Sequence, residues 1–420
     1  MVNTVIMGQG YVGLPLAQGL ANTGTQKSVL GFDVSERVVN NLNNGISHID
    51  DISNAEVSEI IAKGYRATCT PADIATADTV VICVPTPLYE TGEPDLSYVE
   101  SAVQLIADNM SPGTLVILES TTYPGTTEDL VRPMLEKGGR ELDKDFYLAF
   151  SPERIDPGNK QYKITNTPKI VGGSSAESTK RALAFYTQFI ETVIETVGTR
   201  EAETAKLLEN TYRHVNIALM NEMAMFCHEL GIDVWEVVRL ASSKPYGFQA
   251  FYPGPGVGGH CIPVDPNYLS YEVKRRLGVP FRFIEMATDI NTGMPNYVVG
   301  RIQDLLNDQS KALKGSRVLL LGVTYKPDIA DLRESPALEV AELLLDKGAD
   351  MVFHDPHATQ FRVHGEMLQG QTDLDAALAA ADVVVLLQAH KAYDLEDIAS
   401  KSKVIFDTRG KLSGANVERL

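Results

Sequence analysis

The stretch Thr4-Val-Ile-Met-Gly-Gln-Gly-Tyr-Val-Gly13 decides the fold of this chain. Its first four residues, three of which are apolar, are typical of a buried strand, and residues 14–23 then follow a helical spacing. The three glycines between them have the GxGxxG spacing, which allows a tight turn, a close approach of the backbone to a pyrophosphate, and close packing of helix on strand. The motif is weak evidence alone, so its surroundings must support it.

A second apolar strand, residues 29–32, ends at Asp33, about where an acidic residue binds the ribose hydroxyls of a dinucleotide. A plain turn residue at a strand end is the alternative interpretation of Asp33. Further strands at 79–84, 115–118 and 147–150 each run into polar or proline-rich residues. Because ligands bind at the carboxyl ends of such strands, we expect NAD, in preference to NADP, at this edge of a sheet.

The middle of the chain changes to helical periodicity, with one long helix expected from about 201 to 230. An apolar stripe recurs on it at threes and fours, formed by Leu208, Tyr212, Val215, Leu219, Met223 and Phe226. This stripe is expected to pack against a neighbouring domain or a second subunit. Strands return at 316–322, and a second βαβ pattern without the glycine motif follows.

The predicted fold class is therefore α/β, with two Rossmann-like doubly wound domains joined by a central helical domain that contains one long helix. We place the domains at residues 1–197, 198–300 and 301–420. A chain of 420 residues is long enough for such a division.

The bulk composition excludes several classes of function. A formal net charge of −18 argues against nucleic acid as a partner. The sequence has no apolar run of about 18 residues that would span a membrane, and it enters a strand directly without a signal-like segment, so we expect a cytoplasmic protein. Cysteines at 69, 83, 227 and 261 show no disulfide or metal-binding spacing, so we expect thiols and no metal site.

Cys261 lies in the run Tyr252-Pro-Gly-Pro-Gly-Val-Gly-Gly-His-Cys-Ile-Pro-Val-Asp-Pro266, where glycines and prolines confine one thiol. A small buried apolar residue in a turn is the alternative for this cysteine. Lys206 and Asn210 are four residues apart, on one face near the start of the long helix, although a solvated first turn would produce the same pattern.

The motifs together resemble those of one family across essentially the whole chain. They are GQGYVGLP from Gly8, VPTP at 84–87, STTYPGTT at 120–127, SPER at 151–154, KLLENTYR at 206–213, GPGVGGHCIPVDP at 254–266 and GVTYKPDIADLRESPA at 322–337. The chain resembles a bacterial nucleotide-sugar 6-dehydrogenase of the UDP-glucose/GDP-mannose dehydrogenase family. The runs ERIDPGN at 153–159 and GGHCIPVDP resemble the UDP-N-acetylhexosamine subgroup. This favours UDP-N-acetylglucosamine as substrate, its mannosamine epimer second, with UDP-glucose a further alternative.

The resemblance implies an NAD-dependent, four-electron oxidation of the sugar C6 alcohol to a uronate, for surface polysaccharide precursors. The apolar stripe of the long helix predicts a homodimer through that helix. Cys261 would form a thiohemiacetal and then a thioester. The catalytic positions implied are Cys261, Lys206, Asn210, Asp265, Glu153 and Thr121. Among Thr121, Glu153 and Asp265 no single general base is assigned, and His260 is a further candidate for activating the thiol.

The resemblance also assigns binding positions. Cofactor contacts are expected at Gly8, Gly10, Tyr11, Val12, Gly13, Asp33, Arg37, Thr86, Thr121 and Arg333. UDP-sugar contacts are expected at Glu153, Arg154, Lys206, Asn210, Tyr252, Gly254, Gly256, Gly258, Lys326 and Arg409. Many relatives supply an arginine from the neighbouring subunit just before the glycine loop, whereas residues 242–256 contain only Lys244 as a basic residue.

Two other classes compete with this interpretation. A simple two-electron dehydrogenase would need a His or Lys acid/base but not Cys261. A non-catalytic NAD-responsive protein would need neither Lys206 nor the confined thiol.

Overall fold

The computed structural model describes residues 2–49, 52–89, 91–155, 159, 161–259 and 261–420. The chain packs into two compact units, one formed by residues 1–209 with 267–278 and the other by 210–266 with 279–420. The central helical region is thus divided between the units, and the boundaries at 197 and 300 stay predictions. No helix within the described ranges combines the length and the apolar character that crossing a bilayer requires.

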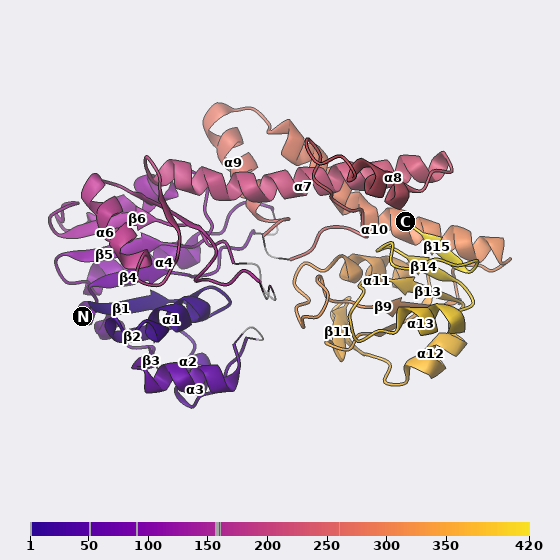
Figure 1. Ribbon diagram of the computed structural model, residues 1–420, viewed down its shortest axis with the longest axis horizontal. Helices are drawn as coiled ribbons and strands as arrows, with labels where there is room; N and C mark the ends of the chain where they lie inside the picture. Colours follow the sequence, from indigo (N-terminus) through magenta and orange to yellow (C-terminus); the bar gives the residue numbers. More distant parts are fainter. Residues whose placement is uncertain (1, 50–51, 90, 156–158, 160, 260) are drawn as a thin grey trace. The chain divides into compact units, whose positions relative to one another are not determined.

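The first unit contains an eight-stranded sheet in the order β3-β2-β1-β4-β5-β6-β7-β8, whose first six strands are parallel neighbours (Figure 1). This order is that of a doubly wound dinucleotide fold. The strands are β1 (Val2–Met7), β2 (Gln26–Phe32), β3 (Tyr65–Thr68), β4 (Thr79–Ile82), β5 (Thr114–Leu118), β6 (Phe146–Phe150), β7 (Lys169–Gly173) and β8 (Val193–Glu195). β7 runs antiparallel to β6, and β8 pairs parallel with β7 at the edge of the sheet.

Helices cover this sheet because its strands are apolar on both faces; Val80, Val81 and Ile82 of β4, for example, are all fully buried. The helical segments are α1 (Gly13–Asn22), α2 (Glu36–Asn43), α3 (Asn54–Ala62), the 3₁₀ turn Pro71–Thr76, α4 (Ser97–Asn109), the π-turn Thr127–Val131, α5 (Arg132–Leu135), α6 (Ala176–Tyr186) and α9 (Asp265–Leu277). α9 packs on this unit although it follows the cysteine loop, since Tyr268 donates a 3.1 Å hydrogen bond to the carbonyl of Pro87.

The second unit contains a five-stranded parallel sheet in the order β10-β9-β13-β14-β15 and a separate hairpin, β11-β12. Its elements are β9 (Arg317–Leu321), α11 (Pro336–Asp346), β10 (Asp350–His354), β11 (Gln360–Val363), β12 (Glu366–Gln369), α12 (Leu374–Ala380), β13 (Val383–Leu386), α13 (Leu395–Lys401), β14 (Ile405–Asp407) and β15 (Val417–Arg419). This is the second Rossmann-like domain that the sequence predicts.

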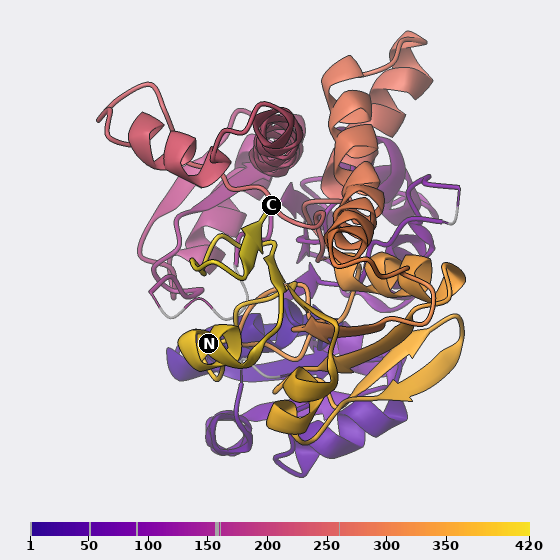
Figure 2. The same ribbon diagram turned by 90° about the vertical axis from the view of Figure 1, so that its right-hand side faces the viewer.

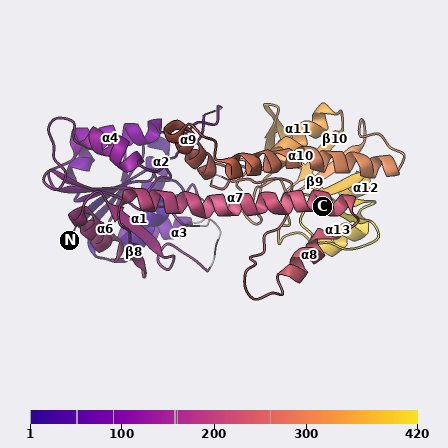
Figure 3. The ribbon, with the colours of Figure 1, turned by 90° about the horizontal axis from the view of Figure 1, so that it is seen from above.

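The long helix α7 (Thr199–Glu229) is continuous over 31 residues and is seen end-on in Figure 2. Its second half lies beside α10 (Arg282–Asp308), as Figure 3 shows. The buried amide of Asn221 donates a 2.9 Å hydrogen bond to Asn291 there. The shorter α8 (Val234–Ala241) follows α7.

Only part of the predicted apolar stripe of α7 is exposed, since Val215 and Met223 are half-buried and Met223 packs against the buried cluster of Ala224, Cys227 and Val234. Leu208, Leu219 and Phe226 are 62 %, 50 % and 58 % exposed. Packing of these exposed side chains against a second subunit or a neighbouring domain stays a prediction.

Candidate active site

The glycine turn after β1 has the shape that a dinucleotide pyrophosphate needs. A Cβ at Gly13 would lie 1.8 Å from the carbonyl oxygen of Gly8, so only glycine lets α1 begin here. α1 has no side-chain cap and no acidic residue in its first turn. The positive end of the helix dipole is therefore left to attract an anion.

Asp33 lies directly after β2, with its carboxylate held at this turn. Its Oδ2 accepts a 3.0 Å hydrogen bond from the backbone N–H of Gln9, and its Oδ1 accepts a 2.9 Å bond from that of Ser35. These contacts place the carboxylate beside the glycine turn, which fits recognition of ribose hydroxyls.

The other cofactor positions lie partly around this turn. Thr86 is buried after β4 and Thr121 is half-buried after β5, so both follow strands at the same edge of the sheet. Tyr11 and Val12 are half-buried on the turn itself, whereas Arg37 is exposed on α2. Arg333 belongs to the second unit, where its guanidinium pairs with Asp331 at 2.6 Å. Its contact with the cofactor stays a prediction.

Cys261 is exposed in the turn that leads into α9. Its carbonyl oxygen accepts hydrogen bonds from the backbone N–H groups of Val264 (3.3 Å) and Asp265 (2.9 Å). Asp265 is the first residue of α9 and is only 2 % exposed. The thiol therefore lies next to a helix N-terminus, where negative charge is stabilised.

Asn210 meets Asp265 directly, because its side-chain amide donates a 2.5 Å hydrogen bond to Asp265 Oδ2. Asn210 and Lys206, one turn earlier on α7, are 5 % and 8 % exposed. The alternative of a solvated first turn is thus wrong for this pair.

The start of α7 is fixed to the first unit by Glu203. Its carboxylate accepts hydrogen bonds from the backbone N–H groups of Gly125 (2.5 Å) and Thr127 (2.9 Å) and from the Thr127 hydroxyl (2.7 Å). Burial raises the pKa of Glu203 to about 7, against the opposing effect of these hydrogen bonds. This anchor sets the position of Lys206 one turn later.

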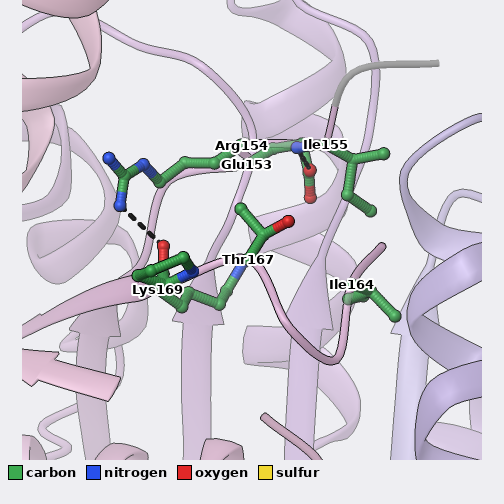
Figure 4. A pocket seen from close by; sticks show the side chains of 7 residues that line it. Glu153, Arg154, Ile155, Ile164, Thr167 and Lys169 are labelled. Carbon is green, nitrogen blue, oxygen red and sulfur yellow. Dashed lines mark hydrogen bonds between the residues drawn. The ribbon is translucent and has the colours of Figure 1, made fainter. Parts of the chain in front are cut away.

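Glu153 and Arg154, in the turn after β6, line a cavity of about 10 Å³ (Figure 4). Glu153 Oε1 accepts a hydrogen bond from the backbone N–H of Ile155, while the buried Oε2 accepts none from the described residues. Arg154 donates to the carbonyl of Pro168 at 2.6 Å and forms a two-point ion pair with Glu209 on α7, at 2.7 and 3.3 Å. The structure thus uses Arg154 to tie this turn to α7. Its contact with substrate stays a prediction.

Two sequence candidates fall outside the described residues. They are His260 and the Asp156-Pro157-Gly158 part of the subgroup run.

A second cavity, of about 320 Å³, lies in the second unit at the carboxyl edge of its sheet. It is lined by Trp235, Tyr252, Pro253, Pro327, Gln388, Ala389, Arg409, Gly410 and Lys411. The rings of Trp235 and Tyr252 are nearly parallel, 15° apart, with centroids separated by 6.2 Å. Aromatic faces beside cations suit a base attached to phosphates.

Hydrogen bonds to Asp407 and Leu387 position the two cationic residues of this cavity, Arg409 and Lys411. Buried Asp407 accepts hydrogen bonds from the backbone N–H groups of Arg409 (2.8 Å) and Lys411 (2.5 Å), and Arg409 Nε donates to the carbonyl of Leu387 at 2.6 Å. Burial lowers the pKa of Arg409 to about 10, which leaves the guanidinium charged at neutral pH.

The family models cover most of the chain. The three parts of the UDP-glucose/GDP-mannose dehydrogenase family match in order: the NAD binding domain at residues 2–190, the central domain at 200–293 and the UDP binding domain at 319–414. The chain belongs to the UDP-glucose/GDP-mannose dehydrogenase family. It is an NAD-dependent nucleotide-sugar dehydrogenase whose substrate is a UDP-sugar.

Individual relatives of this dehydrogenase are similar over their whole length. UDP-N-acetyl-D-mannosamine dehydrogenase of Salmonella typhi is 36 % identical over 423 residues, covering 96 % of this chain and 98 % of that one. The solved UDP-D-ManNAc dehydrogenase of Pyrococcus horikoshii has a TM-score of 0.90 and 32 % identity, with 99 % and 98 % covered. The UDP-N-acetyl-mannosamine dehydrogenase of Staphylococcus aureus has a TM-score of 0.85 and 33 % identity, with 99 % and 97 % covered.

The glycines of the dehydrogenase's cysteine loop lie in close contact with the second unit's own residues. A Cβ at Gly258 would lie 2.6 Å from the carbonyl oxygen of Glu334 and 2.8 Å from Tyr325 Cβ. At Gly254 it would lie 3.0 Å from Arg409 Nη1, and at Gly256 it would lie 2.9 Å from Pro336. The glycines let the loop pack closely on the UDP binding domain. Their contact with substrate stays a prediction.

The loop that carries Lys326 is held by buried groups that the sequence did not reveal. His390 Nδ1 accepts a 2.9 Å hydrogen bond from the backbone N–H of Asp328, and His390 Nε2 lies 3.1 Å from Asp355. Gln388 donates to the carbonyl of Tyr325 at 2.8 Å. Asp328, His357 and His390 lie close enough together to hold a metal ion, but both ring nitrogens of His390 are already engaged in holding the loop.

Trp235, Gln388 and Lys411 are among the cavity residues of the dehydrogenase that sequence reasoning missed. Trp235 is the chain's one tryptophan, and its indole N–H donates a 2.9 Å hydrogen bond to the carbonyl of Leu420. Its rarity was the available signal. Gln388 gave none, because it follows β13 in a run that reads only as a buried strand.

Proposed function

We propose that this enzyme oxidises the C6 hydroxymethyl group of a UDP-N-acetylhexosamine to a carboxylate, with UDP-N-acetylmannosamine as the preferred substrate. The observation that carries the reaction type is the exposed Cys261 thiol at the start of α9, next to the buried Asn210–Asp265 pair. A dehydrogenase that stops at the aldehyde has no use for such a thiol.

The choice of sugar reverses the order expected from the sequence. The subgroup runs favoured UDP-N-acetylglucosamine, but the Salmonella, Pyrococcus and Staphylococcus relatives all carry names of mannosamine dehydrogenases. Both sugars share the acetamido group, so the subgroup assignment is kept and only the epimer changes.

The first domain would hold the cofactor through the glycine turn and Asp33. Bound there, NAD supplies the acceptor for a hydride leaving C6. The Asp33 carboxylate accepts hydrogen bonds from ribose hydroxyls and repels a 2′-phosphate. Thr86 and Thr121 follow neighbouring strands and line the same edge.

Cys261 would carry the second oxidation. Its thiolate adds to the aldehyde carbon, the carbonyl electron pair moves to oxygen, and the oxygen takes a proton to give a thiohemiacetal. Loss of a second hydride to another NAD, with loss of the hydroxyl proton, would leave a thioester. Water then attacks the acyl carbon, the C–S bond breaks, and the thiolate and uronate are released.

Lys206 and Asn210 would stabilise the negative charge that develops on the C6 oxygen. Their burial strengthens this interaction, because a cation and an amide donor act most strongly where water is sparse. The hydrogen bond to Asp265 fixes the Asn210 amide in one orientation.

Proton movement belongs to Glu153, Asp265 and Thr121. The buried Oε2 of Glu153, which accepts no hydrogen bond from the described residues, supports a part for this carboxylate in activating water.

The 320 Å³ cavity would hold the UDP portion of the substrate. Arg409 and Lys411 supply positive charge for the diphosphate, and Trp235 and Tyr252 offer ring faces to the uracil. Lys326 directly precedes Pro327, which lines the cavity, so we expect Lys326 to contribute to the same binding site.

A homodimer through α7 completes the proposal, in a cytoplasmic enzyme. The exposed stripe at Leu208, Leu219 and Phe226 needs a partner surface, and a second copy offers an identical one. Phe226→Glu should convert a dimer to a monomer in sedimentation at micromolar concentration, while a wild-type monomer would contradict this part.

A panel of UDP-sugars tests the substrate assignment. NADH formation should give the highest kcat/KM with UDP-N-acetylmannosamine, then UDP-N-acetylglucosamine, with UDP-glucose lowest by about a hundredfold, because a group that pairs with the acetamide is left unsatisfied. A highest value with UDP-glucose would refute the acetamido subgroup, and a highest value with UDP-N-acetylglucosamine would refute the epimer.

A further inference from the structure

A buried group of charges lies beneath the turn that carries Glu153. Glu119, directly after β5, is 0 % exposed, and Lys169, the first residue of β7, is 4 % exposed. The Lys169 ammonium group donates to the Glu119 carboxylate and, at 3.2 Å, to the carbonyl of Pro152, the residue before Glu153. Lys169 and Glu153 also line the same 10 Å³ cavity (Figure 4).

This buried group contains more carboxylates than cations. Two carboxylates, Glu119 and Glu153, face one ammonium group, Lys169. The other titratable groups around them are Tyr186 on α6, which donates a 2.7 Å hydrogen bond to Glu119, and the buried Cys83 thiol after β4. On the outer side of the turn, Arg154 is already paired with Glu209.

We propose that Lys169 and Glu119 are positioning residues for Glu153: the ammonium group is divided between the two carboxylates, and the charge of Glu119 decides how much of it Glu153 receives. The hydrogen bond from Lys169 to Pro152 holds the backbone of the turn, so that the cation and the carboxylate keep a fixed separation. This inference rests on the proposed role of Glu153 in proton movement.

Electrostatics supports this arrangement. Burial raises the pKa of Glu119 to about 7, and the charge of Glu153 adds to the effect. Burial also lowers the pKa of Lys169, but the facing carboxylates outweigh it and raise the pKa above its ordinary value, so the ammonium group stays charged. Glu119 therefore gains or loses its charge near neutral pH beside a permanent cation.

The acidic limb of the pH profile of kcat is the range in which kcat rises as Glu153 loses its proton. Two substitutions should move this limb in opposite directions. Lys169→Met removes the cation that favours ionised Glu153, so the limb should move to higher pH by about one unit or more. Glu119→Gln removes the competing carboxylate and leaves the cation to Glu153, so the limb should move to lower pH. A merely structural role would lower the rate in both variants and leave the limb in place.

Three controls sharpen the measurement. Lys169→Arg keeps the cation and should keep the wild-type limb, as should Lys180→Met, an exposed lysine on α6. Tyr186→Phe loses the hydrogen bond that favours ionised Glu119, together with a side-chain hydrogen bond to Ser151, so its limb should move slightly to lower pH. Tyr186→Phe also decides the question where Glu119→Gln or Lys169→Met fails to fold.

The profiles are measured as NADH release from the whole enzyme with saturating UDP-sugar and NAD. Unchanged limbs, or limbs that move in the same direction in Lys169→Met and Glu119→Gln, overturn the inference. The variant Glu153→Gln distinguishes a failure of this inference from a failure of the proposed function. Uronate formation near the wild-type rate in that variant refutes the role of Glu153 itself, whereas an inactive Glu153→Gln with unchanged limbs in the other variants refutes only the part of Lys169 and Glu119.

Discussion

Asn210 on the long helix α7 donates its side-chain amide to the carboxylate of Asp265, the first residue of α9, over 2.5 Å. Both residues are almost fully buried. The bond links the residue proposed to stabilise the C6 oxygen to the turn that carries Cys261. A buried carboxylate that fixes an amide has few substitutes, because loss of either partner leaves the other unsatisfied.

Asp265→Asn tests this link. The new amide presents a donor where Asn210 needs an acceptor, so kcat for NADH formation should fall about a hundredfold or more. KM for the UDP-sugar should change far less. Asp373→Asn, at the exposed N-cap of α12, is the control and should retain wild-type kcat. An active Asp265→Asn would remove Asp265 from the mechanism.

Cofactor preference depends on Asp33. The wild type should show a much higher kcat/KM with NAD than with NADP, since the carboxylate beside the glycine turn repels a 2′-phosphate. Asp33→Asn removes that charge and should lower the ratio of kcat/KM with NAD to kcat/KM with NADP by at least about tenfold. Equal values for the two cofactors in the wild type would contradict this assignment.

The ion pair between Arg154 and Glu209 should act as one unit. Arg154→Ala and Glu209→Ala should each lower kcat/KM by about tenfold, because both release the Glu153 turn from α7. The double variant should be no worse than either single one. Arg181→Ala breaks a comparable surface pair with Glu177 on α6 and should leave the rate unchanged. If Arg154 contacts substrate instead, Arg154→Ala will lower kcat/KM more than Glu209→Ala does.

Stability should depend on pH through Glu203. Its pKa is about 7 in the folded chain, above its ordinary value of 4.5, so the folded state holds the proton more tightly. The wild type should therefore lose unfolding free energy, relative to Glu203→Gln, as pH rises from about 5 to 8. Below pH 4.5 the difference between the two proteins should be constant. Denaturant unfolding at several pH values gives this difference, and a difference that does not change with pH would contradict the raised pKa.

Much of the fold follows from local sequence patterns. The glycine turn, the strand that ends at Asp33 and the thirty-residue periodicity of α7 each carry a strong signal, so both Rossmann-like sheets and the long helix could be predicted. The antiparallel β7 could not, because a run such as Lys169-Ile-Val reads the same in either direction. The hairpin β11-β12 turns at His364-Gly365. This pair is a weaker hairpin signal than Asn-Gly or Asp-Gly, so the hairpin could not be predicted.

The site divides in a similar way. Cys261, Lys206 and Asn210 stand in motifs, so they could be singled out from the sequence, and their catalytic roles stay predictions. Glu119, Lys169 and Tyr186 could not be found, because each belongs to a different strand or helix and only the folded sheet brings them together. The packing role of Gly258 also needed the structure, since its neighbours Tyr325 and Glu334 are distant in sequence.

The measurement that bears most directly on the central claim is the yield of NADH and of uronate per UDP-sugar, compared between the wild type and Cys261→Ala. The wild type should release two NADH for each uronate, with little free aldehyde, because the thiohemiacetal retains the sugar. Cys261→Ala should bind the UDP-sugar almost as well but form no sustained uronate, stopping at a trace of aldehyde or one slow NADH equivalent. Uronate production by this variant near the wild-type rate would show that the thiol is structural and that hydration of the aldehyde suffices.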